Sequence, residues 1–190
     1  DIEKSRAAPR RFILVLLNDF TLLSFAAAID CLRLANQMAG EDLYSWRIIG
    51  EGGGTISCST GTVFTLDSDL DELHRDDTVI LCGGRDVQAA TTKRILNWLR
   101  REARRGIIMG GLCTAAFSLA KAGLLDGKRA TIHCENHDSF TVEFLDVELT
   151  KLVFVKDGNT WTIACGTSAV DLLLQLIAQT HVQTLPTAVA

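Results

Sequence analysis

The sequence predicts an α/β protein with a mainly parallel sheet and helices on both faces. One observation is a recurring unit of apolar strand, turn and helix, which is typical of parallel sheets with crossover helices. Another is that residues 12–17 are continuously apolar, as expected of a strand buried on both faces. The turns of the recurring unit are Asn18-Asp19, Gly83-Gly84, Gly110 to Cys113, and Gly166.

The same patterns give each element in order. Residues 1–10 read as a polar leader. Strands are expected at residues 12–17, 44–50, 78–82, 129–132, 147–155 and 160–163, and in the apolar run leading into Gly110. Helices are expected from Leu22 to a stop at Gly40, after a cap at Thr91 or Thr92, and over residues 115–122, 138–144 and 169–179. Residues 58–66 predict a small hairpin and 70–73 at most a short helical turn.

Length and composition favour a single cytoplasmic domain. The chain has 190 residues, of which 47% are apolar, enough for one large core. Its net charge of −4 gives no general signal for nucleic acid or membrane, and no apolar run is long enough to span a bilayer. Six cysteines are spread singly without a C-x-x-C pair, which indicates a reducing compartment and neither a disulfide framework nor a zinc ribbon.

The turn around Cys113 has the form of a nucleophile elbow. Small residues at Gly111 and Ala115 flank the cysteine between a buried strand and a helix. Backbone N–H groups at a helix N-terminus favour a thiolate. The alternative is a buried structural cysteine, which is common in strand–helix turns.

Because the strands are predicted to be parallel, their carboxyl ends should meet at one edge and form a shared crevice. His133, at the end of a predicted strand, could act there as a base toward Cys113. Gly84 and Thr114 could offer backbone N–H groups to an oxyanion, and Glu135 could orient the histidine. Equally, His133 could be a pocket or interface residue without a catalytic role.

Two other site types receive little support. Residues 133–137 (HCENH) could place two histidines on one helical face, but they lack the spacing of known zinc motifs, so no metal is expected. The chain contains no helix-turn-helix pattern, basic arm or aromatic stacking motif for nucleic acid. The basic outer face of the helix after Thr92 is interpreted as a solvated face.

Several motifs together resemble a known superfamily. They are GGLCTAAF at 110–117, LAKAGLLDGKRATIH at 119–133, LRLAN at 32–36, CGGRDV at 82–87 and GTSAVD at 166–171. This set is similar to the class I glutamine amidotransferase-like superfamily of PfpI/ThiJ type, and more narrowly to the sensor domain of GlxA-like regulators of the AraC family. The resemblance covers nearly all of residues 11–180.

The resemblance implies a flavodoxin-like three-layer sandwich, usually dimeric, joined to a C-terminal pair of helix-turn-helix motifs. Members of this group sense small nitrogenous metabolites such as arginine, glycine betaine or carnitine. The chain departs from related patterns in three respects. Ser24 occupies the position where hydrolytic and deglycase-type relatives have a glutamate beside the cysteine, and Cys134 stands where betaine- and carnitine-type regulators commonly have tryptophan. The sequence stops near Ala190 without a DNA-binding domain.

The sequence therefore predicts the effector-sensing and dimerising domain of a cytoplasmic regulator, with no cofactor. Residues 11–182 are expected to form the sensor domain, and 183–190 to begin a linker to a DNA-binding domain absent from this chain. One alternative is a cysteine-dependent hydrolase or glyoxalase/deglycase-type enzyme, and another is a redox sensor using Cys113 or Cys134. A homodimer is expected to bind its small-molecule effector through Asn18, Asp19, Gly84, Arg85, Cys113, Thr114, His133 and Glu135.

Overall fold

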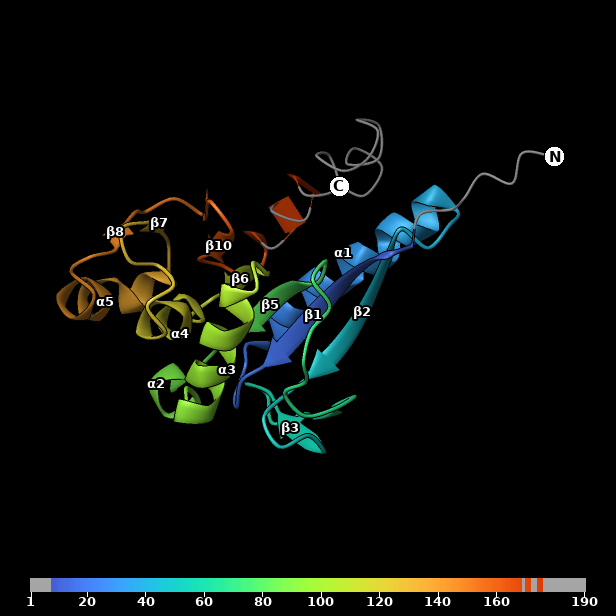
Figure 1. Ribbon diagram of the computed structural model, residues 1–190, viewed down its shortest axis with the longest axis horizontal. Coiled ribbons are helices and arrows are strands. Elements are labelled where there is room, and N and C mark those ends of the chain that lie inside the picture. The colour runs from blue at the N-terminus through green and yellow to red at the C-terminus, as the bar shows by residue number, and fades with distance from the viewer. Residues whose placement is uncertain (1–7, 169, 172–173, 176–190) are drawn as a thin grey trace.

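A computed structural model, which describes residues 8–168, 170–171 and 174–175, has a six-stranded sheet at its centre (Figure 1). The strand order is β2-β1-β5-β6-β10-β9, and only β9 runs antiparallel to its neighbour. The mainly parallel sheet is thus confirmed. The strand bounds are β1 Arg10–Leu16, β2 Tyr44–Ile49, β5 Thr78–Cys82, β6 Ile108–Leu112, β9 Phe154–Asp157 and β10 Thr160–Ile163.

The register of the sheet brings the carboxyl ends of four strands to one level. Leu16 at the end of β1 pairs with Cys82, the last residue of β5. Cys82 pairs in turn with Leu112, which ends β6, and Leu112 pairs with Ile163, which ends β10. The segments that follow these strands therefore emerge side by side, as parallel pairing requires.

Helices cover both faces of the sheet, as predicted. Alternate residues of β1 point to opposite faces, because side chains alternate along a strand. Phe12 and Leu14 pack in one apolar cluster with helix α1 (Leu22–Ala39), and Ile13 and Val15 pack in the other with α3 (Lys93–Arg104) and α4 (Ala116–Lys121). Figure 1 shows the resulting three layers.

The ends of the two long helices have clear local causes. Helix α1 ends at Gly40, which adopts a left-handed conformation with φ of 69°. Helix α3 begins at Thr92, whose side-chain oxygen accepts a hydrogen bond of 3.2 Å from the Ile95 N–H. The start of α1 is capped from another segment, because the Leu22 N–H donates to the Ser59 hydroxyl at 3.2 Å.

Several shorter elements differ from the sequence predictions. The expected hairpin is present but shifted: β3 (Thr55–Ser57) pairs with β4 (Val63–Thr65). Residues 70–73 are not helical, whereas a four-residue helix α2 (Val87–Ala90) was not predicted. Residues 134–136 form a 3-10 turn, η1 (Cys134–Asn136), and α5 (His137–Glu143) follows it. The predicted leader and final helix lie largely outside the described residues.

The two strands predicted at 129–132 and 147–155 are also shorter than expected. Only β7 (Arg129–Ala130) and β8 (Glu148–Leu149) pair with each other, and β9 starts afresh at Phe154. The reason is a side-chain bond: the Thr131 hydroxyl donates to the Leu152 carbonyl at 2.6 Å. The Thr131 N–H donates to the Thr162 hydroxyl at 2.9 Å, so it leaves the β7–β8 ladder.

Gly84 should be the glycine at which a methyl group is least tolerated. A Cβ added there would lie 2.1 Å from the Asp19 carbonyl oxygen, a contact that only a backbone shift can relieve. We expect Gly84→Ala to lower the free energy of unfolding by about 2–3 kcal/mol in urea titration. The matched control is Gly110→Ala in β6, where the nearest atom would be 3.6 Å away. Equal losses in both variants would contradict this account of the packing.

Asp69 should make stability depend on acid pH. One carboxylate oxygen accepts from the Gly52 N–H at 2.8 Å, and the other from Arg94 on α3 at 2.7 Å. The hydrogen bond from Arg94 is the main reason that the pKa of Asp69 falls to about 2. Because the pKa is lower in the folded state, the stabilisation is present above about pH 4, the unfolded value, and is lost as pH falls toward 2.

Asp69→Asn should therefore lower the free energy of unfolding at pH 7 by no more than about 1 kcal/mol, because the ion pair is largely exposed. The difference from wild type should shrink between pH 4 and 2. Urea titrations at a series of pH values measure it. Asp146→Asn, at an exposed carboxylate with no recorded side-chain partner in the described part, serves as the control. A difference independent of pH would exclude this role of the carboxylate.

Candidate functional site

The residue at the centre of the site has an unusual backbone conformation. Cys113 directly follows β6 and has φ of 61°. Among the described residues, only Asp19, Asp86 and Cys113 are non-glycine residues with positive φ. Each follows a different one of three adjacent strands, β1, β5 and β6. Such conformations cost about 1–3 kcal/mol and cluster at functional sites, so this edge of the sheet is the first place to look for function.

The thiol of Cys113 is buried and kept in its neutral form. Its exposed fraction is 7%, and burial is the largest cause that raises its pKa above the ordinary value. The Thr21 hydroxyl, 3.5 Å from the sulfur, and the Thr114 N–H lower the pKa but do not offset burial. Cys165 and Glu135 raise it further. The sequence-based expectation of a favoured thiolate is therefore wrong, because the local N–H groups are outweighed by desolvation.

No acid from α1 activates the thiol. Ser24, at the position suggested for that acid, is buried with 1% exposure. Its hydroxyl has no hydrogen-bond partner among the described residues. Gly166 packs against this part of α1, since a Cβ added to Gly166 would lie 3.2 Å from the Ser24 nitrogen.

His133 is held beside the elbow by its main chain. Its N–H donates to the Cys113 carbonyl oxygen at 3.2 Å. Its ring nitrogen Nδ1 accepts from the Glu135 N–H at 3.4 Å, which places the proton of a neutral ring on Nε2. Among the recorded bonds of the described residues, none joins the imidazole to the Cys113 thiol or to a carboxylate. The base-and-orienter arrangement of a catalytic triad is thus not formed here.

The elbow is tied to the preceding turn by a side-chain hydrogen bond. The Thr114 hydroxyl donates to the Gly84 carbonyl oxygen at 2.7 Å. The Thr114 N–H, predicted to serve an oxyanion, also lowers the pKa of the Cys113 thiol. These contacts fix the turn after β5 against the elbow after β6.

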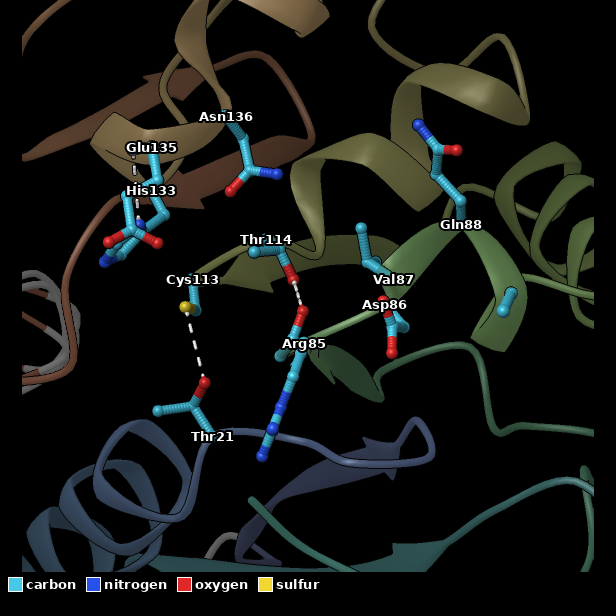
Figure 2. A pocket seen from close by; sticks show the side chains of 12 residues that line it. Thr21, Arg85, Asp86, Val87, Gln88, Cys113, Thr114, His133, Glu135 and Asn136 are labelled. Carbon is cyan, nitrogen blue, oxygen red and sulfur yellow. Dashed lines mark hydrogen bonds between the residues drawn. The ribbon is translucent and has the colours of Figure 1, made fainter.

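A cavity of about 800 Å3 opens beside Cys113 (Figure 2). Six of the eight predicted ligand-binding residues line it, and they come from the segments following β5 and β6 and from the segment around η1. Figure 2 shows His133 and Glu135 on one side, Cys113 and Thr114 at the centre, and Asp86 to Gln88 on the other. The lining residues are Thr21, Gly84, Arg85, Asp86, Val87, Gln88, Ala89, Cys113, Thr114, His133, Glu135 and Asn136.

The other two predicted residues, Asn18 and Asp19, line a neighbouring cavity of about 510 Å3. The two cavities share Arg85, Asp86 and Ala89 in their linings. The single predicted crevice is therefore divided. The cause is the tight packing of the turn after β5 on the Asp19 main chain, which places Arg85 and Asp86 between the two cavities.

Sequence reasoning missed several lining residues. Asp86, Gln88 and Ala89 belong to or precede α2, which is too short to show a helical period. Thr21 could have been suspected, since a threonine before a helical pattern is a typical N-cap, but its hydroxyl points to Cys113 instead.

The segment 133–137 separates two different environments. His133, Glu135 and Asn136 line the 800 Å3 cavity, whereas Cys134 and His137 line a third, of about 640 Å3. The two histidines thus diverge, and the described residues contain no group of three potential metal ligands. Cys134 does not line the cavity beside Cys113. The presence of cysteine instead of tryptophan at this position therefore does not by itself determine which ligands that cavity can bind.

Comparison with known proteins identifies the family. The DJ-1/PfpI family matches residues 10–179. The chain belongs to this family. A crystal structure of an AraC family transcriptional regulator from Pseudomonas putida superimposes with a TM-score of 0.83 at 26% identity, covering 95% of this chain and 97% of that one. The flavodoxin-like α/β fold expected from the resemblance is thereby confirmed.

Curated relatives include transcriptional regulators. The HTH-type regulator CdhR of Pseudomonas aeruginosa is 38% identical over 170 residues, which are 90% of this chain and 50% of CdhR. GlxA of Rhizobium meliloti is 36% identical over 174 residues, 90% of this chain and 53% of GlxA. The chain thus spans about half the length of these regulators. An isonitrile hydratase of Pseudomonas putida is 30% identical over 122 residues, 64% of this chain and 53% of that enzyme.

No helix in the described part of the chain combines the length and apolar character needed to cross a membrane.

The state of the Cys113 thiol can be measured by alkylation. We expect iodoacetamide at neutral pH to modify the exposed Cys134 and Cys165 before Cys113. The alkylation rate of Cys113 should rise with pH. The midpoint of this rise should lie above about pH 8.5, the pKa of a free cysteine, because burial opposes the thiolate. Thr21→Val should raise this midpoint and Glu135→Gln should lower it, since Thr21 lowers and Glu135 raises the pKa. Peptide mass spectrometry assigns each site, and a midpoint below about 7 would contradict the structure.

Proposed function

We propose that this chain is the effector-sensing and dimerising domain of a cytoplasmic AraC-family transcriptional regulator. In this proposal residues 11–182 form the sensor domain, and residues 183–190 begin a linker to a C-terminal helix-turn-helix domain. That second domain would make the DNA contacts, and the sensor domain would bind a small nitrogenous metabolite as a homodimer. The similarity to regulators about twice as long as this chain supports this organisation.

The observation that carries the proposal is the combination of an open polar cavity with an unactivated thiol. The 800 Å3 cavity offers a guanidinium, two carboxylates, an imidazole and two amides to a ligand. A volume of this size is within the range of small-molecule sites. At the same time, burial keeps Cys113 protonated, and neither a carboxylate from α1 nor a hydrogen-bonded base activates it. These features favour binding over catalysis.

Arg85 provides a route by which a ligand could act on the fold. Its guanidinium donates to the Ser59 carbonyl oxygen in the β3–β4 loop over a long 3.4 Å. The Ser59 hydroxyl accepts from the Leu22 N–H at the start of α1. A ligand that draws Arg85 into the cavity would release this loop from one of its contacts. Regulation requires that the two resulting states differ in affinity for the ligand.

A cysteine-dependent enzyme, either hydrolase or glyoxalase/deglycase type, is the second candidate. The strained conformation of Cys113 and the similarity to an isonitrile hydratase favour it. It requires turnover that depends on Cys113. Sustained turnover of an amide, ester, glyoxal or isonitrile substrate, lost in Cys113→Ser, would establish this function instead of a purely sensory one.

A thermal-shift screen with amino acids, betaines and polyamines tests the sensing function. A metabolite that binds only the folded chain at about 100 times its Kd should stabilise it by about 2.7 kcal/mol, seen as a rise in Tm. Arg85→Ala should abolish the rise, whereas Arg104→Ala, at an exposed position on α3 that lines none of the three cavities, should retain it. A screen without any shift, or a shift that survives Arg85→Ala, would count against this site.

A further inference from the structure

The lining of the 800 Å3 cavity carries both signs of charge, with Arg85 and Asp86 in the turn after β5 and Glu135 in η1. Arg85 is the cation, and Asp86 and Glu135 are the carboxylates of the lining. Figure 2 shows Glu135 beside His133 on one side of the cavity and Asp86 on the other, with Arg85 between them. Such a site fits a ligand that itself carries both charges, since each end then meets its complement.

The carboxylate of Glu135 is available to a ligand. Glu135 is exposed, and its side chain has no recorded hydrogen bond or ion pair with the described residues. Its own N–H is taken by His133 Nδ1, which fixes the main chain at the cavity wall. A carboxylate without a protein partner can form short, strong hydrogen bonds with the N–H groups of a ligand's ammonium or guanidinium.

Arg85 can receive the opposite end. Its one recorded bond within the described residues is the 3.4 Å contact with the Ser59 carbonyl, and a guanidinium has five N–H donors. Most of these donors remain free for a ligand carboxylate, which guanidinium binds in a bidentate manner. Because Arg85 comes from the turn after β5 and Glu135 from η1, a ligand held by both would link two segments far apart in sequence.

The cavity lacks the feature that recognises a quaternary ammonium. None of the twelve described residues that line it is Phe, Tyr or Trp. A trimethylated nitrogen has no N–H to donate, and proteins commonly hold it against the faces of aromatic rings. Here such a group would leave Glu135 without a hydrogen bond and would find no ring to replace it.

On the basis of the proposed function, we infer that the effector is a zwitterion whose cationic group bears N–H bonds. Arg85 binds its carboxylate, and Glu135 binds its primary ammonium or guanidinium. The cavity thereby selects against the trimethylated form of the same molecule. The Cys113 thiol, neutral and buried at the centre of the cavity wall, adds a polar contact without a charge.

Calorimetric titration of the chain with matched ligand pairs tests the inference. The pairs are glycine and glycine betaine, and 4-aminobutyrate and its N-trimethyl derivative. Within each pair, net charge and chain length are equal and only the N-methyl groups differ. For the pair that binds, we expect the N–H form to bind at least about tenfold more tightly, because the trimethylated form cannot make the hydrogen bond to the charged carboxylate.

Two variants separate recognition from structure. Glu135→Gln should reduce the preference for the N–H form to within about threefold, because the amide keeps the size of the side chain but not its charge. Asp138→Asn, at an exposed carboxylate that lines the third cavity instead, should leave the preference unchanged. Circular dichroism confirms that each variant is folded, and binding of the trimethylated form provides a second check on the Glu135 variant.

The outcomes distinguish this inference from the function on which it rests. If a trimethylated ligand binds as tightly as its N–H partner or more tightly, the inference is wrong, but the sensing function stands. An unchanged preference in Glu135→Gln also overturns the role of Glu135. If neither member of any pair binds and the thermal-shift screen is equally blank, both are overturned.

Discussion

The site depends on three main-chain segments that pack directly against one another at Gly83 and Gly84. A Cβ at Gly84 would lie 2.1 Å from the Asp19 carbonyl, and one at Gly83 would lie 2.7 Å from the Ala115 nitrogen. The turn after β5 therefore fits between the turn after β1 and the elbow after β6 only because both residues are glycine. This close packing fixes the positions of Arg85 and Cys113 relative to each other, and with them the wall of the cavity.

Much of the fold follows from local patterns in the sequence. The apolar run of β1 predicts a strand buried on both faces, and Gly40 and Thr92 mark helix ends that the structure confirms. Apolar periodicity does not reveal which residues pair across the sheet, yet parallel strands make a shared carboxyl edge a safe expectation, and the register bears it out. The end of the strand after Ala130 is not predictable from the sequence pattern. The Thr131 main chain and side chain form hydrogen bonds with Thr162 and Leu152 in place of a continued strand ladder.

The site was predicted less fully than the fold, for two physical reasons. First, its division into two cavities depends on how closely Gly84 approaches Asp19, which no periodicity reveals. Second, the state of Cys113 depends on a balance between local N–H groups and burial. The sequence shows the strand–helix turn that supplies the N–H groups but not the degree of burial, so it predicts a thiolate that the folded protein disfavours.

The strained elbow thus has a role that does not require a reactive thiol. With φ of 61° at Cys113, the chain turns so that the Thr114 hydroxyl reaches the Gly84 carbonyl and the His133 N–H reaches the Cys113 carbonyl. The same turn therefore joins the β5 segment, which carries Arg85, to the η1 segment, which carries Glu135. A ligand held between these two charges would act on both segments at once.

Because η1 is a single turn of three residues, a displacement of Glu135 would also move Cys134, which lines the third cavity beside the half-exposed Leu152 and Val153. A ligand bound in the polar cavity, as proposed, would in this way also act on the third cavity, and unequal ligand affinity for two positions of η1 is all that such a connection would need to carry a signal.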